Sequence, residues 1–86
     1  MQAIMTKYLN PTNVRGARIK ASCQAKSIVL SWDHNLNATD NHTAAAKTLA
    51  TEMGWNYGEW VGGSLPDGKH DCFVCVNKND QTFRVE

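Results

Sequence analysis

Two neighbouring segments in which apolar and polar residues alternate place the strongest constraint on the fold of this chain. Apolar side chains occupy every second position of residues 17–23, and within residues 26–32 every second position from 28 onwards: Ala17, Ile19, Ala21, Cys23, Ile28, Leu30 and Trp32. Because successive side chains of a strand point to opposite faces, this period predicts two strands. Gln24-Ala25 is a short connection between them. The segments therefore predict a hairpin in an antiparallel sheet with one apolar face and one face open to water.

Residues 38–53 carry a helical pattern. Side chains that recur at spacings of three and four residues form one stripe. The stripe consists of Ala38, His42, Ala45, Ala46, Leu49 and Met53. Asn37 or Asp40 can cap the start of the helix, and Gly54 suits the left-handed conformation that ends many helices. Trp55 then lies where an apolar side chain packs back onto the last turn.

Three further segments read as strands, and they complete the expected fold. They are residues 2–8, residues 59–62 and residues 70–77, with residues 82–85 as an optional last strand. The expected class is α+β, in the order β-β-β-α-β-β, with the helix packed on one face of an antiparallel sheet. The 86 residues are enough for one domain, so we expect residues 1–86 to form a single domain.

The expected compartment follows from the absence of targeting and membrane signals. No run of the chain approaches the about 18 apolar residues of a membrane span. Residues 1–8 are too mixed in character for a signal peptide. Cys23, Cys72 and Cys75 make an odd number of cysteines, which is typical of free thiols in a protein that is not secreted. We therefore expect a cytoplasmic protein with no membrane partner.

Basic residues gather at the start of the chain. Residues 1–26 contain five basic and no acidic residues, whereas the remainder contains four basic and eight acidic ones. One interpretation is a solvated surface, and the other is a basic face for an acidic partner. The candidate contact residues are Lys7, Arg15, Arg18, Lys20 and Lys26. Trp60 is added as a candidate because tryptophan is enriched where binding energy concentrates, although a place in the core is the alternative for it.

Two apparent motifs do not support a cofactor or a metal ion. Residues 63–69 match the first seven positions of the phosphate-binding loop GxxxxGK[ST], but His70 replaces the hydroxyl residue, and a strand is expected to follow. Cys72 and Cys75 match CxxC, yet residues three apart on a strand point to opposite faces. A zinc site built from Cys23, His70 and Cys72 is the alternative to thiols that act as small apolar side chains. We favour the interpretation that the cysteines act as small apolar side chains, and we expect no cofactor.

Catalytic combinations are equally weak. Cys75 with His70 is one pairing of a nucleophile and a base. Ser31 with His34 and Asp33 is another. Neither belongs to a recognisable nucleophile motif, and a chain of this length has little room for a cleft of about 300 Å³. We expect a binding protein rather than an enzyme.

A longer pattern resembles a known family. The segment KYLNPTNVRGARIKA at residues 7–21 is followed by Trp32-Asp33-His34, Asn41-His42, Gly54-Trp55 and Trp60-Val61-Gly62-Gly63. Over residues 7–76 this pattern resembles a family of small proteins from proteobacterial genomes, phages and plasmids. That family has no assigned activity, so the resemblance implies only a context, that of an accessory protein of a mobile element. Small proteins of that kind often block host defences, as anti-CRISPR proteins do.

Two functional hypotheses follow. The first is a non-catalytic protein that binds and inhibits a host protein, in the manner of an anti-CRISPR. The alternative is a small nucleic-acid-binding module that uses the basic N-terminal hairpin on phosphates. The expected exposed face lacks the aromatic rings with which common RNA-binding sheets stack on bases. Association of the chain with further copies of itself is left open.

Overall fold

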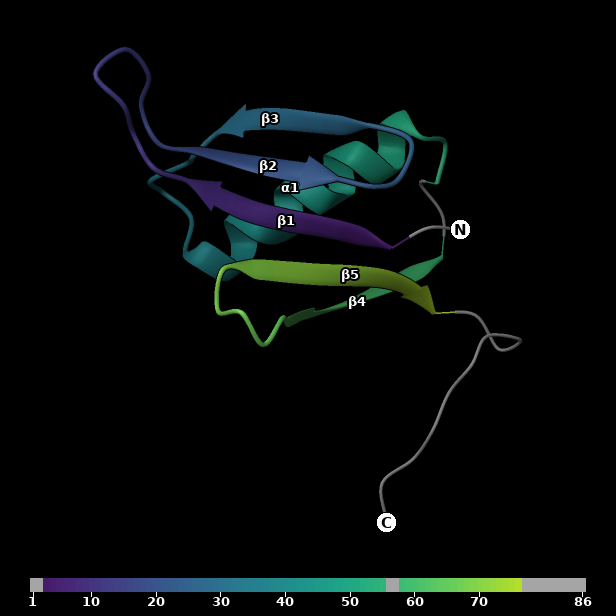
Figure 1. Ribbon diagram of the computed structural model, residues 1–86. Coiled ribbons are helices and arrows are strands. Elements are labelled where there is room, and N and C mark those ends of the chain that lie inside the picture. Colours follow the sequence, from purple (N-terminus) through teal and green to yellow (C-terminus); the bar gives the residue numbers. More distant parts are fainter. Residues whose placement is uncertain (1–2, 56–57, 77–86) are drawn as a thin grey trace.

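The computed structural model describes residues 3–55 and 58–76 (Figure 1). These residues form one helix and one sheet, which confirms the α+β class. The elements are β1 (Ile4–Leu9), β2 (Arg18–Ser22), β3 (Ser27–Ser31), α1 (Ala38–Glu52), β4 (Glu59–Ser64) and β5 (His70–Val76). The optional strand at residues 82–85 lies outside the described residues.

The sheet has five strands in the order β3-β2-β1-β5-β4, and every neighbouring pair is antiparallel. The first strand of the sequence therefore lies in the centre of the sheet. The expected hairpin of β2 and β3 flanks it on one side, and a second hairpin of β4 and β5 flanks it on the other. Within residues 3–55 and 58–76, the two edges of the sheet are consequently β3 and β4.

The helix begins and ends as the sequence indicates. Asn37 is the N-cap, and its Oδ1 accepts a hydrogen bond from the Asp40 backbone N–H at 2.7 Å. Gly54 has a φ of 77°, in the left-handed region that glycine adopts without strain. The Trp55 backbone N–H donates to the Ala50 carbonyl at 2.7 Å, which returns the chain onto the last turn of α1. Local capping thus sets both ends of the helix.

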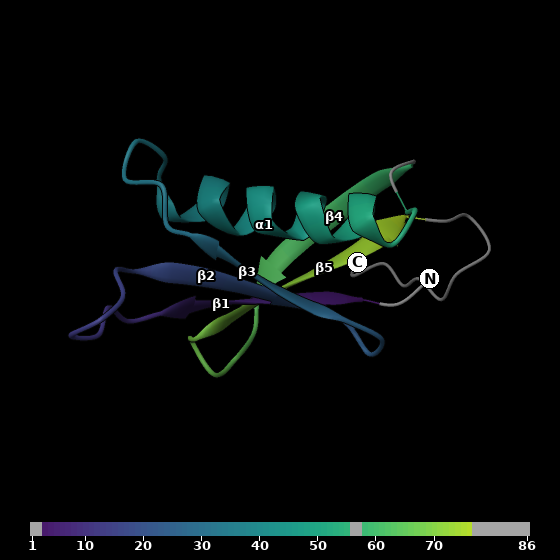
Figure 2. The same ribbon diagram turned by 90° about the horizontal axis from the view of Figure 1, so that it is seen from above.

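The core lies between α1 and one face of the sheet (Figure 2). Its buried side chains are Ile4, Ile19, Ala21, Ala45, Ala46, Leu49, Ala50 and Phe73. The expected stripe needs one correction, because Ala38 is the first residue of the helix and is exposed. The buried stripe begins one turn later, with Asn41 and His42.

Asn41 joins the start of the helix to the loop that precedes it. Its side chain is 3% exposed. The Asn41 Oδ1 accepts the Asp33 backbone N–H at 2.9 Å, and the Nδ2 donates to the Asp33 carbonyl at 2.9 Å and the Asn37 carbonyl at 3.1 Å. A buried amide with this many partners stabilises one loop conformation. The Asp33 and Asn41 segments of the family-like pattern therefore have a structural role.

The position of α1 on the sheet is asymmetric. The helix packs against β1, β2 and β3. On the side of β4 and β5 a groove remains between the helix and the strands. Figure 2 shows α1 over one face of the sheet, and no other described helix or strand lies over the opposite face, which we call the open face. Within the described residues, no helix is both long and apolar enough to cross a membrane.

Candidate functional site

Lys7 and Lys20 lie directly opposite each other on the open face of the sheet. They are partners in the antiparallel pairing of β1 with β2, and both are exposed. The adjacent pair Thr6 and Ala21 is fully buried on the helix side. Since side chains alternate along a strand, the two lysines point away from the helix. Arg18, two residues before Lys20 on β2, has the same orientation and is partly exposed.

This positive charge has no local counterion in the described structure. The ion pairs among the described residues join Lys26 with Glu52, His42 with Asp71, and His70 with Asp67. None of them includes Lys7, Lys20 or Arg18. Like charges directly opposite each other on neighbouring strands destabilise a sheet. The open face therefore carries a positive patch made of these three residues, without an ion-pair partner in the part of the chain that the structure describes.

The other candidate residues lie elsewhere. Arg15 is exposed in the loop that leads into β2, at the end where Arg18 begins the strand. Lys26 lies at the opposite end of the hairpin, and its Nζ is 3.1 Å from Glu52 Oε2 on the helix. Trp60 is partly buried and packs against the core on the helix side. The structure thus brings three of the six candidates together and separates Lys26 and Trp60 from them.

Beside the positive patch, the open face carries exposed apolar side chains, and the exposed Glu59, the partner of Val76, lies at their far end. Val61 and Val74 are partners across β4 and β5 and are 53% and 48% exposed. Val76 and Met5 are exposed on the same face. The alternation of residues 70–77 places Cys72, Val74 and Val76 on one face but does not by itself show that this face is exposed. The burial of Phe73 identifies the exposed face, because it assigns the residues next to it on β5 to the open face.

At the rim of the positive patch, the carboxylate of Asp67 already has hydrogen-bond partners. His70, the cross-strand partner of Lys7, has its Nδ1 2.6 Å from Asp67 Oδ2. The backbone N–H of Lys69 donates to Asp67 Oδ1 at 2.9 Å. This hydrogen bond, with the His70 side chain, lowers the pKa of Asp67 from 3.8 to about 2. Asp67 is thus held by its own turn rather than by the lysines.

The two catalytic combinations that the sequence allows on paper are not brought together among the described residues. Cys75 is the cross-strand partner of Trp60 and faces the helix side, whereas His70 faces the open side. Ser31 is exposed on β3, while Asp33 accepts the Asn35 backbone N–H at 2.9 Å in the following loop. Each of these groups therefore has a separate local environment.

A polar cluster of the buried Thr6 and His42 and the partly exposed Asp71 also lacks the geometry of a catalytic triad. Thr6 Oγ1 lies 2.6 Å from His42 Nδ1, and Asp71 Oδ2 lies 3.7 Å from that same nitrogen. A triad needs the nucleophile and the carboxylate on different ring nitrogens of the histidine. Thr6 is also fully buried, so no substrate can reach its hydroxyl. The contacts within the cluster provide hydrogen-bonding partners for polar side chains at the interface of helix and sheet.

The cysteines lie on different faces of the sheet. Cys23 packs against the core, whereas Cys72 is the partner of Met5 on the open face. Cys75 faces the opposite side from Cys72, as expected for residues three apart on a strand. Residues 3–55 and 58–76 contain no group of three His, Cys, Asp or Glu side chains that could hold a metal ion. Cys23, His70 and Cys72 therefore do not form a zinc site.

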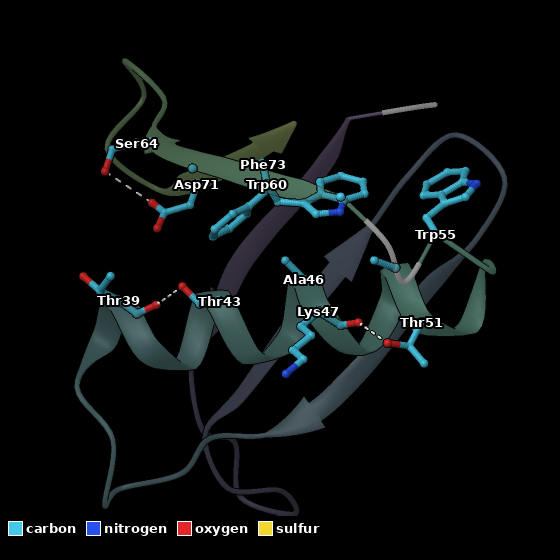
Figure 3. A pocket seen from close by; sticks show the side chains of 14 residues that line it. Thr39, Thr43, Ala46, Lys47, Thr51, Trp55, Trp60, Ser64, Asp71 and Phe73 are labelled. Atoms are coloured by element: carbon cyan, nitrogen blue, oxygen red, sulfur yellow. Dashed lines mark hydrogen bonds between the residues drawn. The ribbon is translucent and has the colours of Figure 1, made fainter. Parts of the chain in front are cut away.

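A groove of about 620 Å³ lies between α1 and the hairpin of β4 and β5 (Figure 3). This volume corrects the expectation that the chain has little room for a cleft of about 300 Å³. Phe73 and Trp60 point into the groove, and Trp55 stacks on Trp60 with ring centroids 6.3 Å apart. At the other end Ser64 Oγ lies 3.3 Å from Asp71 Oδ1. The groove is apolar along most of its length and acidic at one end.

Comparisons with known proteins add no relative: no family model, no curated protein and no solved structure matches this chain.

Proposed function

We propose that this chain is a non-catalytic binding protein whose contact surface is the open face of its sheet, centred on Lys7 and Lys20. The observation that carries this proposal is the direct cross-strand placement of the two lysines without a carboxylate partner among the described residues. That placement costs sheet stability. A role in contacting an acidic surface gives the cost a functional reason.

The preferred partner is a protein. Exposed valines lie on the same face as the lysines, namely Val61, Val74 and Val76. An apolar patch beside charged residues is the composition of a protein interface. A nucleic-acid-binding sheet, the second candidate, stacks bases on aromatic rings. The described strands turn no Phe, Tyr or Trp side chain to the open face, so this observation favours a protein over nucleic acid.

The biological setting of the proposal comes from the family-like pattern at residues 7–76. It suggests an accessory protein of a phage or other mobile element, and the partner is then a host protein. A protein that performs no chemistry can inhibit its target by covering a functional surface. We therefore place this chain with inhibitors of the anti-CRISPR kind.

Affinity capture from a host lysate, with and without nuclease, tests the proposal. Lys20→Glu should abolish capture of the partner, whereas Lys47→Glu should retain it, because Lys47 is exposed on α1 in the other layer of the molecule. Capture should survive nuclease treatment. If capture disappears with nuclease, the nucleic-acid alternative replaces the protein partner. If both charge reversals bind as well as the original chain, the open face is not the contact surface.

A further inference from the structure

In the described structure β4 is an edge strand, and its outer edge presents backbone groups without a partner next to the groove. The backbone N–H of Leu65 donates to the His70 carbonyl at 2.8 Å, so these opposed residues form a hydrogen-bonded pair. In an antiparallel ladder, hydrogen-bonded and non-hydrogen-bonded pairs alternate. Continuing the register back along β4 makes Ser64, Gly62 and Trp60 members of non-hydrogen-bonded pairs. Their N–H and C=O groups therefore point to the outer edge of the sheet.

The same three residues line the groove. Trp60, Gly62 and Ser64 contribute to its wall, and β4 is the last strand of the sheet. Among the described residues, no hydrogen bond engages the outward backbone groups of these three. An unpaired strand edge is a template for another strand. In this protein the unpaired backbone edge and one wall of the groove are both formed by β4.

We propose that this groove binds an extended peptide segment of another protein, which adds to β4 as a sixth, antiparallel strand. Strand addition of this kind combines main-chain hydrogen bonds with pockets for alternate side chains. The antiparallel direction continues the pattern of every strand pair in the sheet. This site lies on the helix side and is independent of the open face proposed above.

The groove defines the side chains that such a peptide must carry. Opposite Trp60 and Gly62, the wall is apolar, because Phe73 lies against Gly62 and the indole of Trp60 lies beside it. Opposite Ser64, the wall is acidic, because Asp71 is the cross-strand partner of Ser64. Alternate residues of a strand face the same side. An antiparallel peptide therefore needs the pattern basic-x-apolar-x-apolar.

Charge complementarity supports the basic position. The Asp71 side chain is 24% exposed, and its ion-pair partner among the described residues is His42 at 3.7 Å. The same nitrogen of His42 is already in contact with Thr6. Figure 3 shows the Lys47 side chain pointing away from β4 and β5. The Ser64 hydroxyl lies 3.3 Å from Asp71 Oδ1, and the carboxylate retains lone pairs for a cation that enters along the groove.

The dimensions of the groove fit a short strand. Its helix side extends from Thr39 to Thr51, which is about 18 Å at the helical rise. Five extended residues span about 17 Å. The volume of about 620 Å³ also lies in the range of built binding pockets, about 300–1,000 Å³.

The other strand that could occupy the edge of β4 comes from this chain itself. Phe83 and Val85, outside the described residues, alternate as the apolar residues of a strand do. In the pattern that the groove requires, the basic residue would then stand at position 81, which is Gln81. This segment provides no cation for Asp71, and we therefore assign the groove to a partner peptide.

The test uses the full chain and an end-blocked synthetic peptide of sequence Lys-Thr-Val-Thr-Ile. Binding should shift the amide resonances of Trp60, Gly62 and Ser64 and slow their exchange with solvent, while β3, the other edge, stays unchanged. A peptide with an N-methylated valine should bind about tenfold more weakly or worse, because it loses the central main-chain hydrogen bond. Equal affinity of the methylated peptide would overturn strand addition.

A double-mutant cycle between the lysine of the peptide and Asp71 tests the role of Asp71 without depending on the stability of the variant. Replacing the lysine of the peptide by norleucine should weaken binding to the original chain about three- to tenfold and leave binding to Asp71→Asn unchanged. Equal losses with both proteins would refute the basic position. Binding that appears only in a Phe83→Ser/Val85→Ser variant of the full chain would assign the groove to the chain's own segment and overturn the proposal, as would a complete absence of binding.

Discussion

Lys7 on β1 and Lys20 on β2 project from directly opposed positions on the open face of the sheet. Lys7 also has His70 as its partner on β5, and Lys20 has Val29 as its partner on β3. No acidic residue is a member of this row across four strands. The two lysines repel each other within the folded protein. The effect of this repulsion on stability and the effect of the lysines on binding can be measured separately.

The repulsion between Lys7 and Lys20 predicts that neutralising one lysine stabilises the fold. Lys20→Gln should raise the free energy of unfolding by about 0.2–1 kcal/mol, because it removes a like charge directly opposite Lys7. Urea denaturation at low salt measures the change, and added salt should shrink it. Lys47→Gln on the exposed side of α1 is the control and should change stability by less than about 0.5 kcal/mol. A destabilised Lys20→Gln protein would contradict the repulsion.

The packing of α1 on the sheet predicts a large effect at Leu49. This side chain is fully buried, so Leu49→Ala should lower the free energy of unfolding by about 2–5 kcal/mol through lost burial and a cavity. For a domain of this size that is a large part of the total stability. Thr48→Ala is the control, because Thr48 is partly exposed and bonds only the Ala44 carbonyl of its own helix. Thermal unfolding of the two variants with equal midpoints would contradict the packing.

The two central glycines of β4 should respond in opposite ways. A Cβ added at Gly62 would lie 2.3 Å from Phe73 Cε1, whereas a Cβ at Gly63 would meet nothing within 4 Å. Because Phe73 is a buried ring, Gly62→Ala should destabilise the protein by about 1–3 kcal/mol. Gly63→Ala should be neutral or stabilise by up to about 1 kcal/mol, since alanine restricts the unfolded chain. Equal unfolding midpoints for the two variants would refute the placement of Phe73.

Acid should weaken the turn between β4 and β5. The pKa of Asp67 falls from 3.8 to about 2 in the folded protein, chiefly through the backbone N–H of Lys69 and then through His70. A depressed carboxylate pKa stabilises the fold above the unfolded value and loses this contribution as the pH falls through the folded value. The stability advantage over Asp67→Asn should therefore be complete above pH 3.8 and disappear towards pH 2.

A carboxyl titration by nuclear magnetic resonance measures the same effect directly. The midpoint for Asp67 should lie near 2, and His70→Gln should raise it only part of the way to 3.8, because the Lys69 hydrogen bond remains. A midpoint at 3.8 in the original chain would show that the turn does not hold the carboxylate.

Local patterns in the sequence predict most of the elements. The alternation of residues 17–23 and 26–32 indicates the hairpin that appears as β2 and β3, and the stripe at residues 38–53 indicates α1. Asn37 and Gly54 occupy the cap positions that their chemistry favours. These features succeed because capping and periodicity depend on residues close in sequence.

The candidate site depends on pairings that local patterns do not contain. Lys7 meets Lys20 only because β1 pairs with β2 in one register, and a shift by one residue would turn the strand over. Lys26 has the same charge and is close in sequence, yet the turn carries it to Glu52 on the helix. The groove likewise requires β5 to pair with β1, which places the hairpin of β4 and β5 beside the helix.

The central claim is that the lysine pair contacts the partner, and a double charge reversal tests it most directly. Lys7→Glu/Lys20→Glu keeps two like charges opposite each other, so the free energy of unfolding should change by less than about 0.5 kcal/mol. The affinity for the captured partner, measured by titration at low salt, should fall by at least about a hundredfold. Lys47→Glu should bind as the original chain does. A double reversal that folds normally and binds the partner with unchanged affinity would contradict the account.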